Sequence, residues 1–215
     1  MENKKINANS YDLLPPLYDI RGFFILSFAY RNSIFRQLRF FSENMKEKHL
    51  ECAIGTGTFT KLCLLMKGFF GNKLVTNVVG VDYSEALMGG AKKKLKNCEL
   101  KIEDLRNLSF EDASFDSVNL PNGFHTIDGI EKVLDETTRV LKPGGSYYVN
   151  VLTPPGGGFL NWISKAVNNY GKNIGILNRP YSGEEARGLL ESRNLEIISQ
   201  NQVGNCANLK SRKIS

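Results

Sequence analysis

Short apolar runs and segments with helical spacing alternate along most of the chain. Apolar or β-branched runs bounded by turn residues predict strands. Seven such runs lie at 49–54, 74–81, 98–103, 115–120, 146–152, 195–200 and 208–214. An apolar position every three or four residues predicts helices. These segments lie at 58–67, where Gly68 is the expected stop, and at 85–96, 129–141 and 183–192.

This alternation of strands and helices predicts right-handed crossovers and a parallel sheet with helices on both faces. The last two strands have no helix between them, so we expect an antiparallel pair at one edge. The expected fold class is α/β, with a Rossmann-like, seven-stranded and mostly parallel sheet.

Two segments fall outside the alternation. Residues 1–45 contain too many aromatic side chains to be solvated, so we expect a helical lid that packs on the sheet. Residues 154–180 are rich in Gly, Asn and Pro, and we expect a lid or substrate insertion with a short helix near 160–167. Residues 46–215 then form the main domain.

Composition fits one folded domain. The 215 residues are 41% hydrophobic and 23% charged, which excludes a disordered chain. The densest apolar stretch, residues 22–30, is about half the ~18 residues that a membrane span needs. The N-terminus lacks the apolar core of a secretory signal, so we expect a cytoplasmic protein.

The net charge of +6 does not by itself indicate nucleic acid. The lysine clusters at 92–96 and 210–213 lack the interleaved aromatic residues of a single-strand-binding face, so no nucleic-acid partner is expected. Arginines and aromatic residues alternate over 11–41, which leaves two alternatives open. This segment packs on the sheet, or it contacts an anionic membrane to collect a lipophilic substrate. The four cysteines form no CxxC pair, so no metal site is expected.

Candidate chemistry lies in the loops after the first strands, because ligands of open α/β sheets bind beyond the carboxyl ends of the strands. Gly55 and Gly57 follow the first strand and allow a ligand to approach bare backbone beside a helix N-terminus. A tight turn without a ligand would carry the same residues. Thr60 stands where a dinucleotide fingerprint has its third glycine, which disfavours a nicotinamide-dependent oxidoreductase.

The next two strands end in carboxylates. Asp82 can accept hydrogen bonds from two ribose hydroxyls, and Ser84 is the better helix cap. Tyr83 can lie on an adenine face. Asp104 can accept from the adenine amine, while the amide of Leu105 donates to a ring nitrogen. Each residue alone also suits a surface turn, but three such loop ends on successive strands indicate a nucleoside site.

These loops resemble those of class I S-adenosylmethionine-dependent methyltransferases, in particular the type 11 group that contains the ubiquinone and menaquinone biosynthesis methyltransferases. The family sequence L-D-x-G-x-G-x-G matches residues 50–57, and E-x-x-R-V-L-K-P-G-G matches residues 136–145. The sequence D-x-x-x-L-P-F-x-D-x-S-F-D matches residues 104–116, with Ser109 in the place of Pro. Two further departures occur: Ala53 replaces the first glycine, and the loop at 120–125 is about one residue short.

The resemblance implies S-adenosylmethionine as cofactor, S-adenosylhomocysteine as product and no metal. It implies methyl transfer to a small-molecule acceptor, which a lipophilic compound would fit. The implied cofactor-binding residues come from the strand ends and the N-terminal segment: Glu51, Ala53, Gly55, Thr56, Gly57, Asp82, Tyr83, Ser84, Asp104, Leu105, Leu120 and Tyr18.

Two histidines are present. His125 lies in a loop beyond a strand and is the candidate catalytic base, with a loop histidine bonded to the backbone as the alternative. His49 begins a strand and is interpreted as structural.

Other functions stay open at this stage. An RNA or protein methyltransferase and a catalytically silent S-adenosylmethionine-binding protein both fit the motifs. The sequence leaves the acceptor, the methylated atom and the oligomeric state undetermined.

Overall fold

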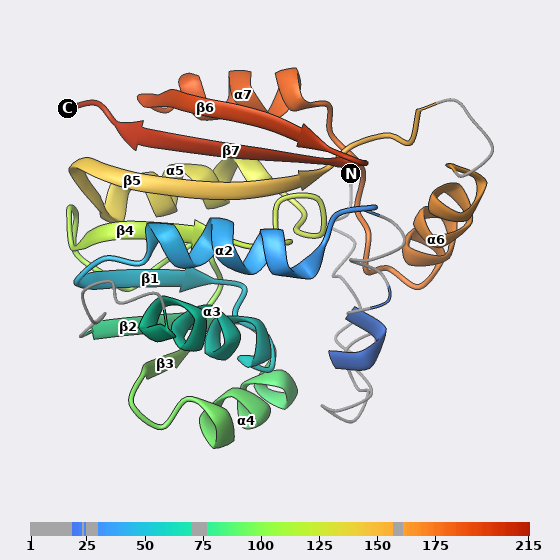
Figure 1. Ribbon diagram of the computed structural model, residues 1–215. Coiled ribbons are helices and arrows are strands. Elements are labelled where there is room, and N and C mark those ends of the chain that lie inside the picture. Colours follow the sequence, from blue (N-terminus) through green and yellow to red (C-terminus); the bar gives the residue numbers. More distant parts are fainter. Residues whose placement is uncertain (1–18, 23, 25–29, 70–76, 157–160) are drawn as a thin grey trace.

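A seven-stranded sheet runs through the molecule in the computed structural model, which describes residues 19–22, 24, 30–69, 77–156 and 161–215. The strand order is β3-β2-β1-β4-β5-β7-β6 (Figure 1), and only β7 is antiparallel to its neighbours. The strands are β1 (Lys48–Cys52), β2 (Asn77–Asp82), β3 (Glu99–Ile102), β4 (Phe115–Leu120), β5 (Leu141–Leu152), β6 (Leu195–Val203) and β7 (Cys206–Lys213). The expected fold class and the antiparallel terminal pair are confirmed.

Helices cover both faces of the sheet, as expected. One face carries α2 (Ile34–Asn44), α3 (Thr58–Phe69) and α4 (Glu85–Lys94), and the other carries α5 (Ile130–Val140) and α7 (Gly183–Glu191) (Figure 1). The sixth helix, α6 (Asn161–Asn173), lies beyond the carboxyl ends of the parallel strands.

The main apolar core lies between the sheet and the α5–α7 face. Leu50 and Cys52 of β1 point into it together with Val118 and Leu120 of β4, and all are fully buried. Leu134 of α5 packs in the same cluster. Cys52, Cys63 and Cys206 are buried free thiols, whereas Cys98 is partly exposed.

Three local expectations need correction. Gly68 does not end α3, which continues to Phe69, because open space around Gly68 leaves only the modest helix penalty of glycine. The strand β5 begins at Leu141 rather than Ser146, directly after α5. Phe115 pairs with Leu141 and Ser117 with Ser146, so residues 142–145 form a bulge. The helix expected near 160–167 runs from Asn161 to Asn173.

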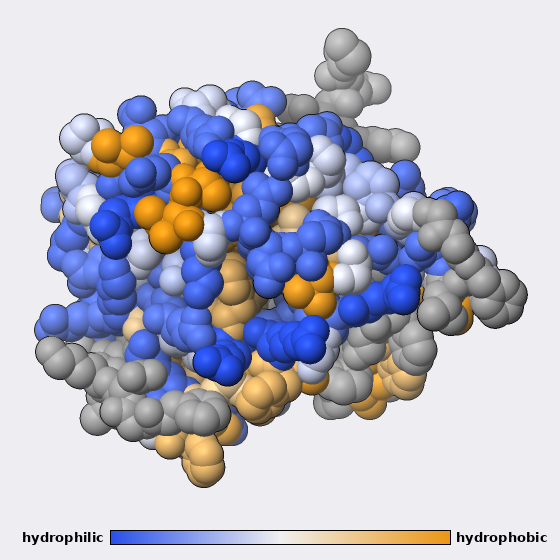
Figure 2. Space-filling view, turned by 45° about the horizontal axis from the view of Figure 1, so that its top comes forward, coloured by the Kyte–Doolittle hydropathy of each residue, from blue (hydrophilic) through white to orange (hydrophobic). Residues whose placement is uncertain are grey.

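The outer hairpin of β6 and β7 presents a polar edge. Most side chains of β6 are exposed, and polar residues predominate in its sequence LEIISQNQV. The face in Figure 2 is largely hydrophilic, with apolar residues in separate groups. Polar edge strands disfavour pairing with a strand of another molecule.

Candidate functional site

The loops expected to carry the chemistry meet at one edge of the sheet. Because β1 pairs in parallel with both β2 and β4, the strand order reverses beside the turn that follows β1. Such a reversal opens a crevice at the carboxyl ends of the strands. The backbone joins these loops: the amide of Ile54 donates to Val81 O at 3.1 Å, and that of Glu103 to Asp82 O at 3.2 Å.

The turn after β1 is held by left-handed backbone. Ala53, Gly55 and Gly57 have φ values of 52°, 57° and 73°. A Cβ on Gly57 would lie 3.1 Å from the Cα of Ala91 and 2.8 Å from Leu95 Cδ1, so α4 packs against bare backbone here. Position 53 is glycine in the family pattern, and a positive φ explains that choice because glycine adopts it without strain. Ala53 adopts the same backbone conformation with strain.

Asp82 ties the first loop to the second. One carboxylate oxygen accepts from the Gly55 amide at 2.8 Å and the other from the Ser84 amide at 2.9 Å. Burial raises the pKa of Asp82 above its usual value, although these backbone donors oppose the shift. Ser84 Oγ accepts from the Leu87 amide, which confirms that Ser84 caps α4.

The third loop follows β3, and in it Asp104 is exposed whereas Leu105 is buried. Tyr83, in the second loop, is 46% exposed. The hydrogen bonds from Arg106 lower the pKa of Asp104, and the shortest joins Arg106 Nη2 to Asp104 Oδ2 at 2.6 Å. No motif in the sequence had singled out Arg106.

Glu51 lies under this edge in a buried polar network. Its Oε2 lies 2.8 Å from His49 Nε2 and accepts from Asn119 Nδ2 at 3.1 Å. His49 Nδ1 lies 2.7 Å from the hydroxyl of Ser117. The other oxygen, Oε1, is buried and has no hydrogen-bond partner among the described residues. An unpartnered buried carboxylate oxygen is costly, so a bound donor is expected there.

The helix α2 packs over this polar network and bonds to it. Asn44, at the end of α2, donates to the side-chain oxygen of Asn119 at 2.9 Å and to the carbonyl oxygen of Val118 at 2.8 Å. Asn119 also donates to the carbonyl of Phe41. Sequence reasoning missed both asparagines, because no motif includes them.

The N-terminal segment reaches the turn through Asp19. Its carboxylate accepts from Thr58 Oγ1 at 2.7 Å, from Lys94 Nζ at 2.8 Å and from the hydroxyl of Thr56. Burial opposes ionisation, but the hydrogen bonds from Lys94, Thr56 and Thr58 outweigh it and lower the pKa of Asp19. The neighbouring Tyr18, predicted to contact the cofactor, lies outside the described residues.

His125 is buried behind the edge rather than open to it. Its Nδ1 accepts from the Leu152 amide at 3.3 Å, and its Nε2 lies 2.5 Å from the hydroxyl of Tyr30. A backbone donor requires an unprotonated Nδ1, which places the proton of the neutral ring on Nε2. Burial lowers the pKa of His125 from 6.5 to about 3. Leu120, also predicted at the site, is fully buried in the apolar core.

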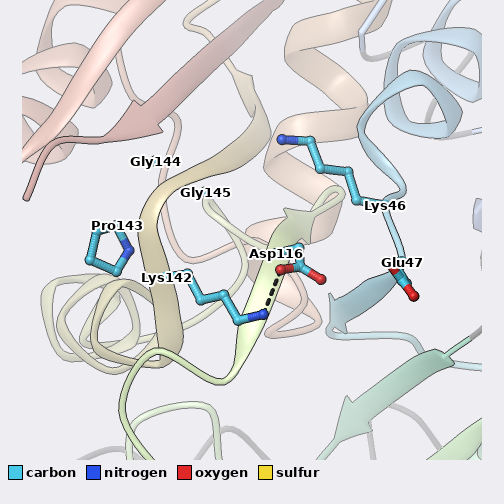
Figure 3. Close-up of a pocket in the computed structure, with 7 residues that line it drawn as sticks. All are labelled: Lys46, Glu47, Asp116, Lys142, Pro143, Gly144 and Gly145. Carbon is cyan, nitrogen blue, oxygen red and sulfur yellow. Dashed lines mark hydrogen bonds and ion pairs between the residues drawn. The ribbon is translucent and has the colours of Figure 1, made fainter.

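A hollow of about 370 Å³ lies at the opposite edge of the sheet, at the amino ends of β1, β4 and β5. In Figure 3, Lys142 points toward Asp116, and the two form an ion pair with Nζ and Oδ1 2.6 Å apart. None of the predicted site residues lines it. The candidate site therefore lies in the loops that follow the carboxyl ends of the parallel strands. No cluster of three or more His, Cys, Asp or Glu arranged for a metal occurs within the described ranges.

Comparison with known proteins agrees with this fold. The family described as "Methyltransferase domain" matches residues 50–149. A methyltransferase from Haloferax volcanii, solved in complex with the Trm112 methyltransferase activator, is 15% identical with a TM-score of 0.69, and 100% of both chains is covered. An S-adenosylmethionine-dependent methyltransferase from Thermotoga maritima is 20% identical with a TM-score of 0.64, covering 90% of this chain and 96% of the other. Residues 50–149 therefore form a methyltransferase domain of the type 11 group, and the fold is that of class I S-adenosylmethionine-dependent methyltransferases.

The similar sequences include methyltransferases that are named for their substrate. The chain is similar to a demethylmenaquinone methyltransferase from Thermotoga maritima, 30% identical over 155 residues, which is 72% of this chain and 65% of that protein. It therefore spans just under two thirds of the length of that relative.

Proposed function

We propose that this protein transfers a methyl group from S-adenosylmethionine to a small-molecule acceptor. The single observation that carries the proposal is the buried, unpartnered Oε1 of Glu51 beneath a left-handed turn at the reversal of strand order. A carboxylate at that point fits the ammonium group of the methionine moiety, which offers the hydrogen-bond donor that Oε1 lacks.

The loops after β1, β2 and β3 would supply the remaining contacts to the cofactor. Gly55, Thr56 and Gly57 offer backbone to the methionine moiety. Asp82 would take the ribose hydroxyls, because its two oxygens have more lone pairs than backbone donors to fill them. Asp104 and the amide of Leu105 would take the adenine edge. Ala53, Tyr83, Ser84, Leu120 and Tyr18 complete the proposed cofactor set.

The bound cofactor supplies a methyl group on a positively charged sulfur. The chain aligns the acceptor with that carbon and excludes water. For His125, a base role stays a prediction. Its burial and its bonds to Tyr30 and Leu152 favour holding the N-terminal segment against the end of β5.

We further propose that the acceptor is a quinone-type compound, because the similar proteins are named for demethylmenaquinone. In this proposal residues 1–45 form a lid, 46–215 form the catalytic domain, and 154–180 help to bind the acceptor. The link from Asp19 to Thr58 and Lys94 supports the lid.

The proposed location is the cytoplasm, with peripheral membrane contact to reach a lipophilic acceptor. Buried free thiols fit a reducing compartment. No helix within the described part of the chain is long and apolar enough to cross a membrane. The complex of the Haloferax volcanii neighbour makes an activator protein a further candidate partner.

A ligand screen tests the function. S-adenosylhomocysteine should raise the melting temperature, because binding to the folded state alone stabilises it, and NAD should not. Incubation with S-adenosylmethionine and a demethylated naphthoquinol should then give a product heavier by one methylene unit in mass spectrometry. Stabilisation by NAD alone would contradict the proposal.

Asp82→Ala tests the cofactor site. We expect binding of S-adenosylhomocysteine to weaken by roughly 1–3 kcal/mol, the scale for losing a charged hydrogen-bond partner. The Gly55 and Ser84 amides lose their acceptor too, so the melting temperature of the free protein should also fall. Asp116→Ala, which removes a carboxylate at the opposite edge, is the matched control and should leave affinity intact. Unchanged affinity of Asp82→Ala in calorimetry would place the ribose elsewhere.

A further inference from the structure

An asparagine directly after β4 presents an unused hydrogen-bond donor. Asn122 has a φ of 57° and is partly buried. Its Oδ1 accepts from Asn150 Nδ2 at 2.7 Å. Its own Nδ2 has no hydrogen-bond partner among the described residues. This atom is not fully buried, so it is accessible to a ligand.

The orientation of this amide is fixed by a backbone group. The Asn122 amide N–H, which can only donate, lies 2.6 Å from Asn150 Oδ1. The Asn150 side chain must therefore present oxygen to that N–H and nitrogen to its other neighbours. Those neighbours are Asn122 Oδ1 and Gln37 Oε1, the latter at 3.2 Å. Asn122 must then direct its Nδ2 group away from β5.

The Asn122 side chain is held in a fixed orientation by buried neighbours. Asn150 in β5 and Gln37 in α2 are both fully buried. They anchor the Asn122 side chain to the sheet and to the helix that covers it. Fixed donors of this kind bind a matching acceptor without first losing side-chain entropy.

The donor also lies next to the methionine end of the proposed cofactor site. A Cβ built on Gly123, the next residue, would lie 3.4 Å from the Cβ of Ala53. The loop after β4 therefore touches the turn after β1, at the reversal of strand order. An acceptor that meets the methyl group there comes within reach of Asn122.

We propose that Asn122 is a specificity-determining residue, whose Nδ2 donates a hydrogen bond to an oxygen of the methyl acceptor. This inference rests on the proposed function and adds the residue that recognises an oxygen of the acceptor, which a phenol- or quinol-type compound carries. An oxygen has a lone pair to spare for the amide. A neutral amine has a single lone pair, which methyl transfer consumes, so an amine cannot accept from Asn122 and react at once.

Two ligands that differ by one oxygen test this. Binding of 1-naphthol and of naphthalene is measured by calorimetry on the full-length protein saturated with S-adenosylhomocysteine. The wild type should prefer 1-naphthol by about tenfold, the scale of one well-placed hydrogen bond. Asn122→Ala should abolish the preference. Because both ligands meet the same variant, general effects on folding cancel in the ratio.

Asn122→Asp is the sharper variant. One aspartate oxygen can still accept from Asn150, and only the outward donor becomes an acceptor. The preference for 1-naphthol should vanish in this variant, while affinity for S-adenosylhomocysteine stays at the wild-type value.

The outcomes separate the two proposals. If S-adenosylhomocysteine fails to bind the wild type, the proposed function is wrong and this inference falls with it. If it binds but 1-naphthol shows no preference over naphthalene, the Asn122 inference alone is overturned. Retention of the preference in both variants overturns it as well.

Discussion

The central strands of the sheet present different side chains to its two faces, and β1 shows this within four residues. Leu50 and Cys52 enter the apolar core beneath α5. His49 and Glu51, on the other face, are equally buried but polar, and they bond to each other. Alternate side chains of a strand point to opposite faces, so one strand serves both.

The neighbouring strands repeat the division. In β4, Val118 faces the core, whereas Asn119 bonds to Glu51 and Asn44. In β5, Val149 faces the core and Asn150 bonds to Asn122. The comparison indicates that the central strands present only apolar side chains to the α5–α7 face. On the α2–α4 face, which has apolar clusters of its own, the same strands also hold polar groups in fixed orientations.

The largest expected effect belongs to the apolar face. Leu134→Ala should lower the free energy of unfolding by about 3 kcal/mol, because Leu134 is fully buried and its removal leaves a cavity. Chemical denaturation measures the loss. Affinity for S-adenosylhomocysteine, measured well below the melting temperature, should not change. A clear loss of affinity would break the comparison between the faces.

The second largest expected effect is a pH dependence of the free energy of unfolding, caused by His125 near the carboxyl end of β4. Burial lowers the pKa of His125 from 6.5 to about 3, so the unfolded chain binds a proton that the folded chain does not. Stability should fall as the pH drops below 6.5, by about 1.4 kcal/mol per unit, or about 2 kcal/mol by pH 5. Denaturant unfolding across this range measures the slope.

The control for this titration is His125→Gln, which cannot gain the proton. Its stability should depend less on pH between 6.5 and 5, a range above the ordinary pKa values of Asp and Glu. Parallel curves for the two proteins would show that His125 is not the group responsible.

The sequence predicted the strands and helices well, because their signals are local. The β-branched run of β2 and the Ser84 cap of α4 need no knowledge of the rest of the chain. The strand order and its reversal at β1 and β4 were not predicted, because pairing between strands far apart in the chain leaves no local signal. The Gly68 stop was wrong by one residue, because glycine costs a helix only a modest penalty and α3 runs to Phe69.

The polar network could not be predicted in the same way. The sequence predicts that helices cover both faces of these strands, but it does not show which polar side chains of HLEC and SVNL bond to one another. Only the packing of α2 shows that Asn44 bonds to Asn119 and that Gln37 bonds to Asn150. The burial of His125 depends likewise on Tyr30, which is 95 positions away in the sequence.

A smaller effect is expected inside the network. Asn119→Leu keeps the side-chain shape but removes the hydrogen bonds to Glu51 and Asn44. We expect a loss of roughly 1–2 kcal/mol in the free energy of unfolding and weaker binding of S-adenosylhomocysteine, because Glu51 loses a bond that orients it. Val118→Ala, its neighbour on the apolar face, should lose stability alone. Equal affinities in the two variants would remove the functional distinction between the faces.

The smallest effect concerns the turn that both faces share. Ala53 has a φ of 52°, where a Cβ is strained, and Ala113 has a φ of 50° in a loop away from the predicted cofactor loops. Glycine relieves roughly 1–2 kcal/mol at such a position but makes the unfolded chain more flexible, so Ala53→Gly should stabilise by about 0.5 kcal/mol. Ala113→Gly is the matched control and should show the same small rise in melting temperature. If only Ala113→Gly stabilises, the methyl group of Ala53 makes contacts that outweigh its strain, and the alanine is then a packing element of the turn.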